Sequence, residues 1–206
     1  MNHHSRNAQP CALPINIEQL RQDIVFTEQL CGKDYQFHTT WGLFSPKAID
    51  TGTRLLLQHM QIQPTDRTLD LGCGYGPLGM VMAQHATHCC LVDKDFVAVE
   101  YARANLKRNQ IPNANVVLSN GLQHIPPQTF TLVASNLPAK SNKEHYILFF
   151  HDICQHLEPG GRCYVVVVNG LRHFIKRTFK TLFGNYTKIK QSTTHTVALA
   201  TKQQEL

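Results

Sequence analysis

From Arg67 onward the chain alternates short β-type segments with longer helical ones, and this pattern limits its possible folds most strongly. The predicted strands are Thr68–Leu71, Cys89–Asp93, Val116–Ser119, Phe130–Ser135 and Arg162–Val168, and the predicted helices between them are Pro77–His85, Phe96–Asn109 and Glu144–Leu157. Strands joined by helical crossovers form a parallel sheet with helices on both faces. Two further strand-like segments, 187–191 and 196–201, predict an antiparallel hairpin at one edge. We therefore expect an α/β, Rossmann-like, doubly wound and mostly parallel sheet.

The first part of the chain has a different pattern. Apolar residues alternate along 24–30 and again along 35–39, which predicts a small β-hairpin ahead of the main domain. The segment 50–53 then leads into a short helix that ends before Pro64. We accordingly divide the chain into an N-terminal extension, residues 1–34, which includes part of the hairpin, and a main domain, residues 35–206.

Composition narrows the class of protein. The 206 residues are 42% hydrophobic and 17% charged, which favours one globular domain with a true core over disorder. The apolar run Cys163–Val168 is far shorter than a membrane-spanning helix, and residues 1–10 are too polar for a secretory signal. Seven cysteines, an odd number in hydrophobic surroundings, suit a reducing compartment. We expect a cytoplasmic protein without a membrane partner.

The strongest local motif follows the first strand of the main domain. In Thr68–Gly79 (TLDLGCGYGPLG), the glycines at 72, 74 and 76 permit a tight turn and a close approach of a ligand to the backbone. Pro77 suits the first position of the helix that follows. The motif predicts a ligand over this turn. Its Gly74-x-Gly76-x-x-Gly79 spacing also matches the dinucleotide-binding fingerprint.

Charge separates the two possible ligands. Asp70 directly precedes the glycines, where its carboxylate would repel a pyrophosphate and attract a cationic amino-acid group. Asp93 ends the second strand, 21 residues beyond Gly72, where a carboxylate can bind both ribose hydroxyls. Asn120 follows the third strand and can hydrogen-bond an adenine edge. The set favours S-adenosylmethionine, which carries an ammonium and a sulfonium and has no phosphate.

The glycine segment resembles motif I of the class I S-adenosylmethionine-dependent methyltransferases, and the likeness extends over about residues 35 to 200. Thr40–Ser45 (TWGLFS) and Asp50–Thr53 (DTGT) resemble the "GxFS…DxGT" signature of the small methyltransferase domain group, which includes ribosomal RNA guanine-N2 methyltransferases. The resemblance implies a seven-stranded sheet with a reversed C-terminal hairpin and S-adenosyl-L-methionine as the cofactor.

A second motif follows the fourth strand. Ser135–Lys140 (SNLPAK) resembles the "NPPY" motif IV of enzymes that methylate amide-like or exocyclic nitrogens. The Asn136 side-chain oxygen and the Leu137 carbonyl could accept the two N–H groups of such a nitrogen, while Pro138 fixes the backbone. No strong base is needed, because alignment directs the lone pair. In isolation, the same tripeptide could simply close the strand with an Asx turn.

This second motif departs from the family pattern at two positions. Leu137 replaces the commoner proline, and Ala139 replaces the aromatic residue that would stack on the target base. Phe44, Trp41 and Tyr146 are candidates for that stacking, and each could instead be a core residue. We predict Phe44 and Lys140 as substrate-binding residues. Lys140 could meet a phosphate or the pocket rim, or it could be a solvated loop lysine.

The positive charge is concentrated late in the chain. The formal net charge is +6, and Pro159–Gln204 contains eight Lys or Arg and no Asp or Glu. Arg172, Lys176 and Lys180 recur every four residues, so one helical face should be basic and suited to RNA phosphates. A solvated helix surface would show the same pattern.

A metal site is not expected. His85-x-x-His88-Cys89-Cys90 contains good zinc ligands, but adjacent strand residues face opposite sides of a sheet and do not easily converge on one ion. The leading hypothesis is an S-adenosylmethionine-dependent methyltransferase acting on an exocyclic amine of RNA, with guanine N2 of ribosomal RNA as the target. The alternatives are a protein glutamine N5 methyltransferase and a non-catalytic RNA-binding module. The sequence assigns no oligomeric state.

Overall fold

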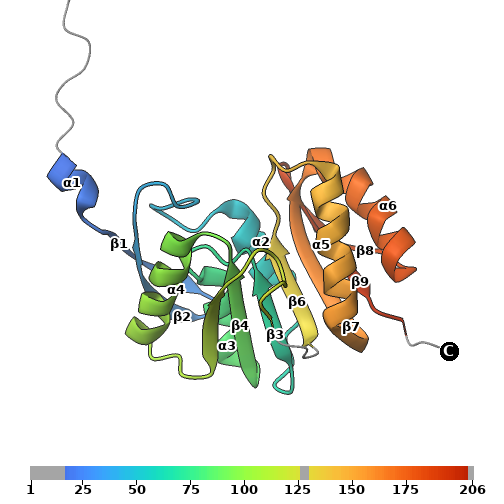
Figure 1. The fold of residues 1–206 in the computed structure, drawn as a ribbon, viewed down its shortest axis with the longest axis horizontal. Helices are drawn as coiled ribbons and strands as arrows, with labels where there is room; N and C mark the ends of the chain where they lie inside the picture. Colours follow the sequence, from blue (N-terminus) through green and yellow to red (C-terminus); the bar gives the residue numbers. More distant parts are fainter. Residues whose placement is uncertain (1–16, 126–129, 204–206) are drawn as a thin grey trace, which may run out of the picture.

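The computed structural model describes residues 17–125 and 130–203 (Figure 1). The first 16 residues of the predicted N-terminal extension lie outside the described residues. The described elements are α1 (Ile17–Arg21), β1 (Ile24–Leu30), β2 (Lys33–Thr39), α2 (Thr51–His59), β3 (Arg67–Leu71), α3 (Pro77–His85), β4 (His88–Asp93), α4 (Phe96–Arg108), β5 (Ala114–Leu118), β6 (Phe130–Asn136), α5 (Lys143–His156), β7 (Leu157–Val168), the 3₁₀ turn η1 (Asn169–Leu171), α6 (Arg172–Phe183), β8 (Thr187–Gln191) and β9 (His195–Thr201).

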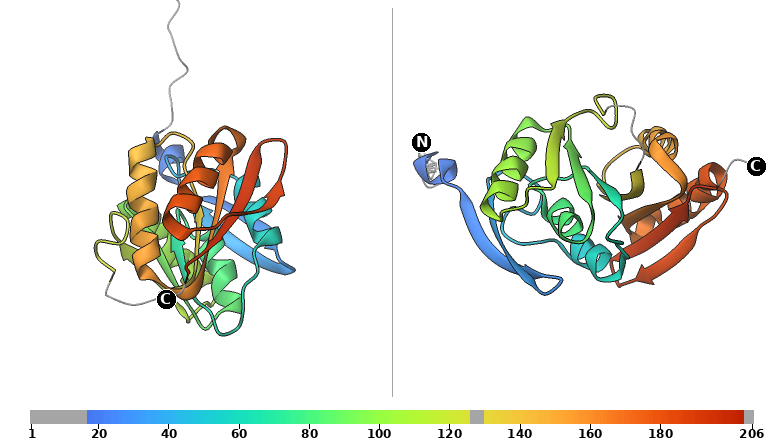
Figure 2. Two further views of the ribbon diagram at one scale, coloured as in Figure 1. Left: turned by 90° about the vertical axis from the view of Figure 1, so that its right-hand side faces the viewer. Right: turned by 90° about the horizontal axis from the view of Figure 1, so that it is seen from below.

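The main sheet has seven strands in the order β5-β4-β3-β6-β7-β9-β8. All neighbouring pairs are parallel except those that include β9, which runs antiparallel to both β7 and β8. Helices cover both faces of the sheet (Figures 1 and 2). The predicted fold class, a doubly wound sheet with a C-terminal antiparallel hairpin, is confirmed.

The core consists of two layers because side chains of each strand alternate between the faces. On one face, buried residues of α2, α3 and α4 pack against Leu91 and Leu132. On the other, buried residues of α5 and α6 pack against Val92 and Val133. Adjacent residues of one strand therefore serve opposite layers.

The sheet reverses its direction of growth between β3 and β6. The chain builds β4 and β5 on one side of β3, then returns to place β6 on the other side. The last paired residues at this junction are Asp70 and Ala134, and beyond them the Ser135 hydroxyl donates to the Leu71 carbonyl at 2.6 Å. A crevice at such a reversal is where open α/β sheets bind their ligands.

The predicted hairpin is a complete ribbon of β1 and β2, paired from Ile24–Thr39 to Leu30–Lys33. It lies beside α4 (Figure 2), and it is held by an asparagine of that helix and by the asparagine that caps its C-terminus. Asn105 and Asn109 each accept one backbone N–H bond from β2 and donate one amide bond to a β2 carbonyl, at 2.8–2.9 Å. The ribbon includes residues on both sides of the predicted boundary between the N-terminal extension and the main domain at residue 34. That boundary remains a prediction.

Several predicted boundaries differ from the observed ones. The helix predicted to follow residues 50–53 already begins at Thr51, because the Asp50 side chain caps it by accepting from the Gly52 and Thr53 N–H groups at 2.8 and 3.2 Å. β7 begins at Leu157 rather than at Arg162, since Leu157 pairs with Phe130 before a register shift. The Gly160–Gly161 turn is thus part of an irregular strand.

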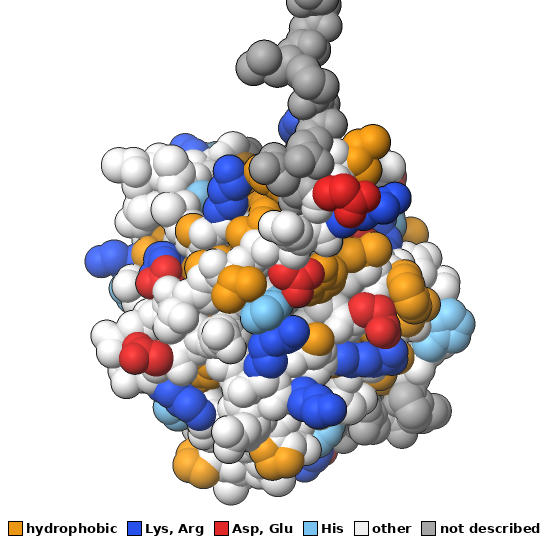
Figure 3. Space-filling model, turned by 90° about the vertical axis from the view of Figure 1, so that its left-hand side faces the viewer, with side chains coloured by type: hydrophobic (Ala, Val, Ile, Leu, Met, Phe, Trp, Pro, Cys, Tyr) orange, Lys and Arg blue, Asp and Glu red, His pale blue; other side chains and the backbone are white. Residues whose placement is uncertain are grey.

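α6 is the basic amphipathic helix predicted from its spacing. Phe174, Ile175 and Phe179 are buried against the sheet, and Lys176 and Lys180 are exposed. A different face of the molecule, seen in Figure 3, carries interspersed acidic and basic side chains. No helix in residues 17–125 or 130–203 has the length and apolar character needed to cross a membrane.

Candidate active site

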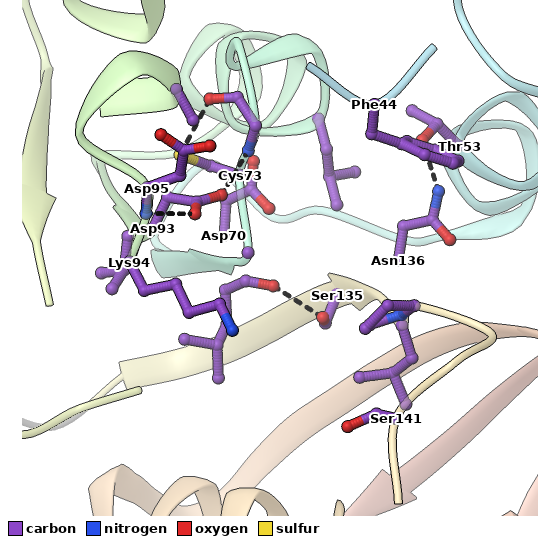
Figure 4. Close-up of a pocket in the computed structure, with 18 of the residues that line it drawn as sticks. Phe44, Thr53, Asp70, Cys73, Asp93, Lys94, Asp95, Ser135, Asn136 and Ser141 are labelled. Carbon is purple, nitrogen blue, oxygen red and sulfur yellow. Dashed lines mark hydrogen bonds between the residues drawn. The ribbon is translucent and has the colours of Figure 1, made fainter. Parts of the chain in front are cut away.

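A cavity of about 770 Å³ opens at the carboxyl ends of β3, β4 and β6 and beside the loop that follows β5 (Figure 4). Nearly all of the residues predicted for cofactor, substrate and catalysis line this one cavity. They are Phe44, Asp70, Gly72, Gly74, Asp93, Asn120, Asn136, Leu137, Pro138 and Lys140. Gly76 does not line it and instead forms the N-cap of α3.

The glycine turn presents bare backbone to the cavity. Gly72 and Gly74 have φ of 78° and 56°, a region that side chains rarely adopt, and a Cβ atom at either position would meet no atom within 4 Å. Gly79, in contrast, is required by packing, because its Cβ would lie 2.4 Å from Leu91 Cγ. The first two glycines therefore leave open space against which a ligand can lie.

Asp70 is the charged group nearest the base of this turn. Its side chain is buried, and Oδ2 accepts the Gly79 N–H at 2.7 Å. Burial raises the pKa of Asp70 to about 7, the Gly79 bond opposes the shift, and the nearby Asp93 carboxylate adds to it. A cationic ligand in the cavity would stabilise the ionised carboxylate.

Asp93 holds a second carboxylate at the edge of the same turn. Its Oδ2 accepts from Gly74 N–H at 2.8 Å, and its Oδ1 accepts from Asp95 N–H at 3.0 Å. Each oxygen keeps acceptor capacity beyond that one bond, so ribose hydroxyls can still bind. Figure 4 shows Asp93 and Lys94 on the side of the cavity opposite Asn136.

These residues fit S-adenosylmethionine. The cavity combines two carboxylates, open backbone at Gly72 and Gly74, and the exposed Asn120 side chain after β5. A pyrophosphate would have to approach both carboxylates, which is unfavourable in a partly buried site. The acidic lining thus favours a cationic cofactor over a dinucleotide.

Asn136, Leu137 and Pro138 lie at the end of β6, across the cavity from the glycine turn. The Asn136 amide nitrogen donates to Asp50 Oδ1 and Oδ2, each at 3.1 Å, and to Thr53 Oγ1 at 3.0 Å. Leu137 N–H donates to the Val166 carbonyl at 3.1 Å, and the Leu137 side chain is buried. The backbone after β6 is therefore anchored while its polar groups line the cavity.

The three aromatic candidates for stacking prove to be in different environments. Phe44 is 70% exposed and lines the cavity. Trp41 is 48% exposed but lies outside the lining, and Lys47 Nζ is 4.7 Å from its ring centroid. Tyr146 also lines the cavity, but it is buried and its hydroxyl donates to the Pro138 carbonyl. Phe44 is the candidate whose ring is free to meet a substrate.

The loop that carries Phe44 is tied to the glycine turn. The Tyr75 hydroxyl donates to the Ser45 carbonyl at 3.1 Å and lies 3.4 Å from the Ala48 carbonyl. Burial raises the pKa of Tyr75, so this hydroxyl keeps its proton. The cofactor-side turn and the loop at the cavity mouth consequently form one connected structure.

Sequence reasoning did not assign roles to several residues of the cavity. Asp50 and Thr53 contact Asn136, and His195 lies against the same wall. The DTGT motif was a signal for Asp50 and Thr53, but it contains no information about a partner 86 residues away.

Potential metal ligands are not clustered in residues 17–125 and 130–203. Across the part of the chain that the structure describes, no three His, Cys, Asp or Glu side chains are grouped so that they could hold a metal ion. Cys89 and Cys90, considered for such a site, face opposite layers of the core.

The doubly wound sheet, the glycine turn with its carboxylates and the Asn-x-Pro segment at the strand reversal define an S-adenosylmethionine-dependent methyltransferase. The sequence profile of the methyltransferase small domain matches residues 34–198. The chain belongs to the methyltransferase small domain family. The predicted family, enzyme class and cofactor are thereby confirmed.

Two relatives of this chain are ribosomal RNA methyltransferases by name. Ribosomal RNA large subunit methyltransferase G of Klebsiella pneumoniae is 30% identical over 188 residues, covering 86% of this chain and 49% of the relative. Ribosomal RNA small subunit methyltransferase C of Hamiltonella defensa is 34% identical over 175 residues, covering 82% and 51%. This chain thus spans about half the length of these relatives.

Among solved structures, the T. thermophilus 16S rRNA N2 G1207 methyltransferase, in complex with AdoMet and guanosine, is similar to this fold. Its TM-score is 0.80 at 24% identity, covering 87% of this chain and 50% of that one. The likeness supports the fold.

Proposed function

We propose that this protein transfers a methyl group from S-adenosylmethionine to an exocyclic amine of ribosomal RNA, with guanine N2 as the acceptor. The observation that carries the proposal is the pair of acceptors at Asn136 and Leu137, placed in one cavity with the carboxylate-flanked glycine turn. The names of the relatives favour ribosomal RNA over other acceptors.

In this proposal, each residue on the cofactor side of the cavity has its own role. S-adenosylmethionine, when bound, supplies a methyl group on a positively charged sulfur. Gly72 and Gly74 give it room, Asp93 binds its ribose hydroxyls, and Asn120 hydrogen-bonds its adenine edge. The buried Asp70 carboxylate stabilises its positive charge.

The acceptor side supplies orientation. The Asn136 Oδ1 atom and the Leu137 carbonyl accept the two N–H groups of the target amine, so that its lone pair is directed away from them and toward the methyl group. Pro138 limits the backbone, and Tyr146 holds the Pro138 carbonyl. A new N–C bond forms as the C–S bond breaks, and the amine then loses its extra proton to water. No residue of the site has to act as a strong base.

The substrate must reach the cavity as an unpaired or flipped base, because a duplex hides an exocyclic amine within its base pair. Phe44 is placed at the mouth to stack on such a base, and Lys140 is exposed there to meet a phosphate. The basic face of α6 offers further phosphate contacts away from the cavity. A cytoplasmic location, expected from the cysteines, belongs to the same proposal.

The test is transfer of radiolabelled methyl groups from S-adenosylmethionine to hypomethylated ribosomal RNA, followed by nucleoside analysis. The expected product is N2-methylguanosine. Asn136→Ala should abolish turnover while sparing cofactor binding, and Asp93→Ala should weaken cofactor binding first. Label in a release-factor-like protein instead would favour glutamine methylation, and label in neither would favour a non-catalytic RNA-binding module.

A further inference from the structure

The Asn136 side chain is held from one side only. Its amide nitrogen lies 3.1 Å from both carboxylate oxygens of Asp50 and 3.0 Å from Thr53 Oγ1. Figure 4 shows the Thr53 bond, with the Asn136 oxygen directed away from it. Among the described residues, the amide oxygen makes no hydrogen bond. The amide thus has a bonded nitrogen end and an open oxygen end.

The chemistry of Asp50 determines which atom of the Asn136 amide, nitrogen or oxygen, faces it. An ionised carboxylate only accepts hydrogen bonds, so it must face the amide nitrogen and cannot face the amide oxygen. Asp50 is itself fixed, because its Oδ1 accepts the Gly52 and Thr53 N–H groups at the first turn of α2. A rigid helix terminus therefore determines the direction of a side chain that ends β6.

We propose that Asp50 is a positioning residue that locks the Asn136 amide with its oxygen toward the substrate. The inference rests on the proposed function and deepens it, since it explains why the site selects an amine. With the oxygen presented, Asn136 and Leu137 form two acceptors that match the two donors of an exocyclic –NH2 group. With the amide reversed, the site would offer a donor and favour an unprotonated ring nitrogen or a carbonyl.

Asp50→Asn tests the lock with little change in shape. Asparagine caps helices as well as aspartate does, so the oxygen of the new amide can continue to accept from Gly52 and Thr53. Its nitrogen then replaces Oδ2, 3.1 Å from the Asn136 nitrogen, where two donors oppose each other. The Asn136 nitrogen keeps Oδ1 of position 50 and Thr53 Oγ1 as acceptors, but a turned Asn136 can now accept from the new nitrogen through its oxygen, so its amide is no longer held in one direction.

We expect Asp50→Asn to lower kcat for ribosomal RNA by about a hundred-fold, as does loss of one oriented polar group in other active sites. The dissociation constant for S-adenosylmethionine should stay within about two-fold of the wild-type value, because Asp50 lies on the acceptor side. Asp23→Asn is the matched control. Asp23 also makes two side-chain hydrogen bonds, with Tyr101 at 2.6 Å and with His38 at 2.9 Å, but it does not line the cavity. The kcat of Asp23→Asn should therefore equal that of the wild type.

Exchange of the two groups provides a rescue. In Asp50→Asn/Asn136→Asp, the amide at position 50 can donate to the carboxylate at position 136, which keeps an oxygen for the substrate. We expect kcat at least ten-fold above that of Asp50→Asn or of Asn136→Asp, whose single change sets two carboxylates against each other. A merely structural role for Asp50 would not give this recovery.

Wild-type activity is measured first, so that absence of any methyl transfer refutes the proposed function and not the lock. If the wild type is active, a folded Asp50→Asn variant within three-fold of its kcat would overturn the lock, and so would a double exchange no better than either single change. Should the variants fail to fold, side-chain amide NMR of the wild type decides. The Asn136 protons should exchange at least ten-fold more slowly than those of the exposed Asn120, and equal rates would refute the lock.

Discussion

Replacing Asp70 with asparagine should stabilise the protein without cofactor and weaken cofactor binding. The buried Asp70 carboxyl has its pKa raised from 3.8 to about 7, mainly by desolvation. A shift of about three pKa units corresponds to about 4 kcal/mol of differential free energy. That free energy opposes folding whenever the carboxyl is ionised, and an asparagine can still accept the Gly79 N–H bond.

The sign of the effect fixes its pH dependence. The folded protein binds the Asp70 proton more tightly than the unfolded chain does, so the free energy of unfolding falls as the pH rises from about 4 to about 7. At pH 8, Asp70→Asn should be more stable than the wild type by up to about 4 kcal/mol, and at pH 5 by about 2 kcal/mol.

Urea unfolding of both proteins from pH 5 to pH 8 measures the effect, with Asp95→Asn as the control. Asp95 is an exposed cap of α4, where asparagine caps as well as aspartate does, so its replacement should not reproduce the gain in stability. Calorimetry should show the opposite trend for the cofactor, with Asp70→Asn binding S-adenosylmethionine about ten- to a thousand-fold more weakly at pH 8, the upper limit being the full shift of about three pKa units. If the free energies of unfolding of Asp70→Asn and wild type depend on pH in the same way, a buried, destabilising carboxylate at this position is refuted.

Three further predictions concern the cavity mouth, the core and the basic helix. Phe44→Ala should raise KM for ribosomal RNA by about ten-fold, as loss of one stacked base implies, while Phe44→Trp should restore it, and steady-state kinetics measure both. Arg162→Met should lower the free energy of unfolding at pH 7 by about 3 to 5 kcal/mol, because it leaves the buried Asp66 carboxylate without the guanidinium now 2.5 Å away. Urea unfolding measures this change, and an unchanged free energy of unfolding would contradict the prediction. Lys176→Glu/Lys180→Glu should make the plot of log affinity for RNA against log salt concentration less steep by about 1.5 in filter-binding assays. An unaltered slope would show that α6 does not contact the RNA.

The parts of the site that sequence reasoning predicted are local in the chain. The glycine turn, Asp70 and Asp93 follow predicted strands at fixed spacings, and the carboxyl ends of parallel strands meet at one edge. Asn136 likewise follows a predicted strand, so the same logic brings it to that edge. Strand boundaries were less predictable, as β7 shows, because its first residues pair through an irregularity that depends on β6.

The environments of these residues depend on contacts between distant segments. Asp70 was expected to face a ligand, yet its burial and the resulting pKa of about 7 depend on how α3 packs over β3. Tyr146 was a candidate for stacking, but the position of α5 brings its hydroxyl to the Pro138 carbonyl instead. Sequence spacing identifies which groups gather at the strand ends, whereas tertiary packing decides their protonation and their free hydrogen-bonding atoms.

The two sides of the cavity have complementary polarity, and both obtain it from helix termini. On the cofactor side, the Asp70 carboxylate is bonded to the first turn of α3 through Gly79, and it favours a cation. On the acceptor side, Asp50 is bonded to the first turn of α2 and to the Asn136 amide nitrogen, and we propose that it thereby directs the Asn136 oxygen toward the target amine. A methyl donor with positive charge and a nucleophile with two N–H groups are the reactants that the proposed function would bring together there. α2 lies outside the segments that carry the glycine turn and the Asn-x-Pro motif, so the proposed lock would give the DTGT segment a part in the reaction that neither motif supplies.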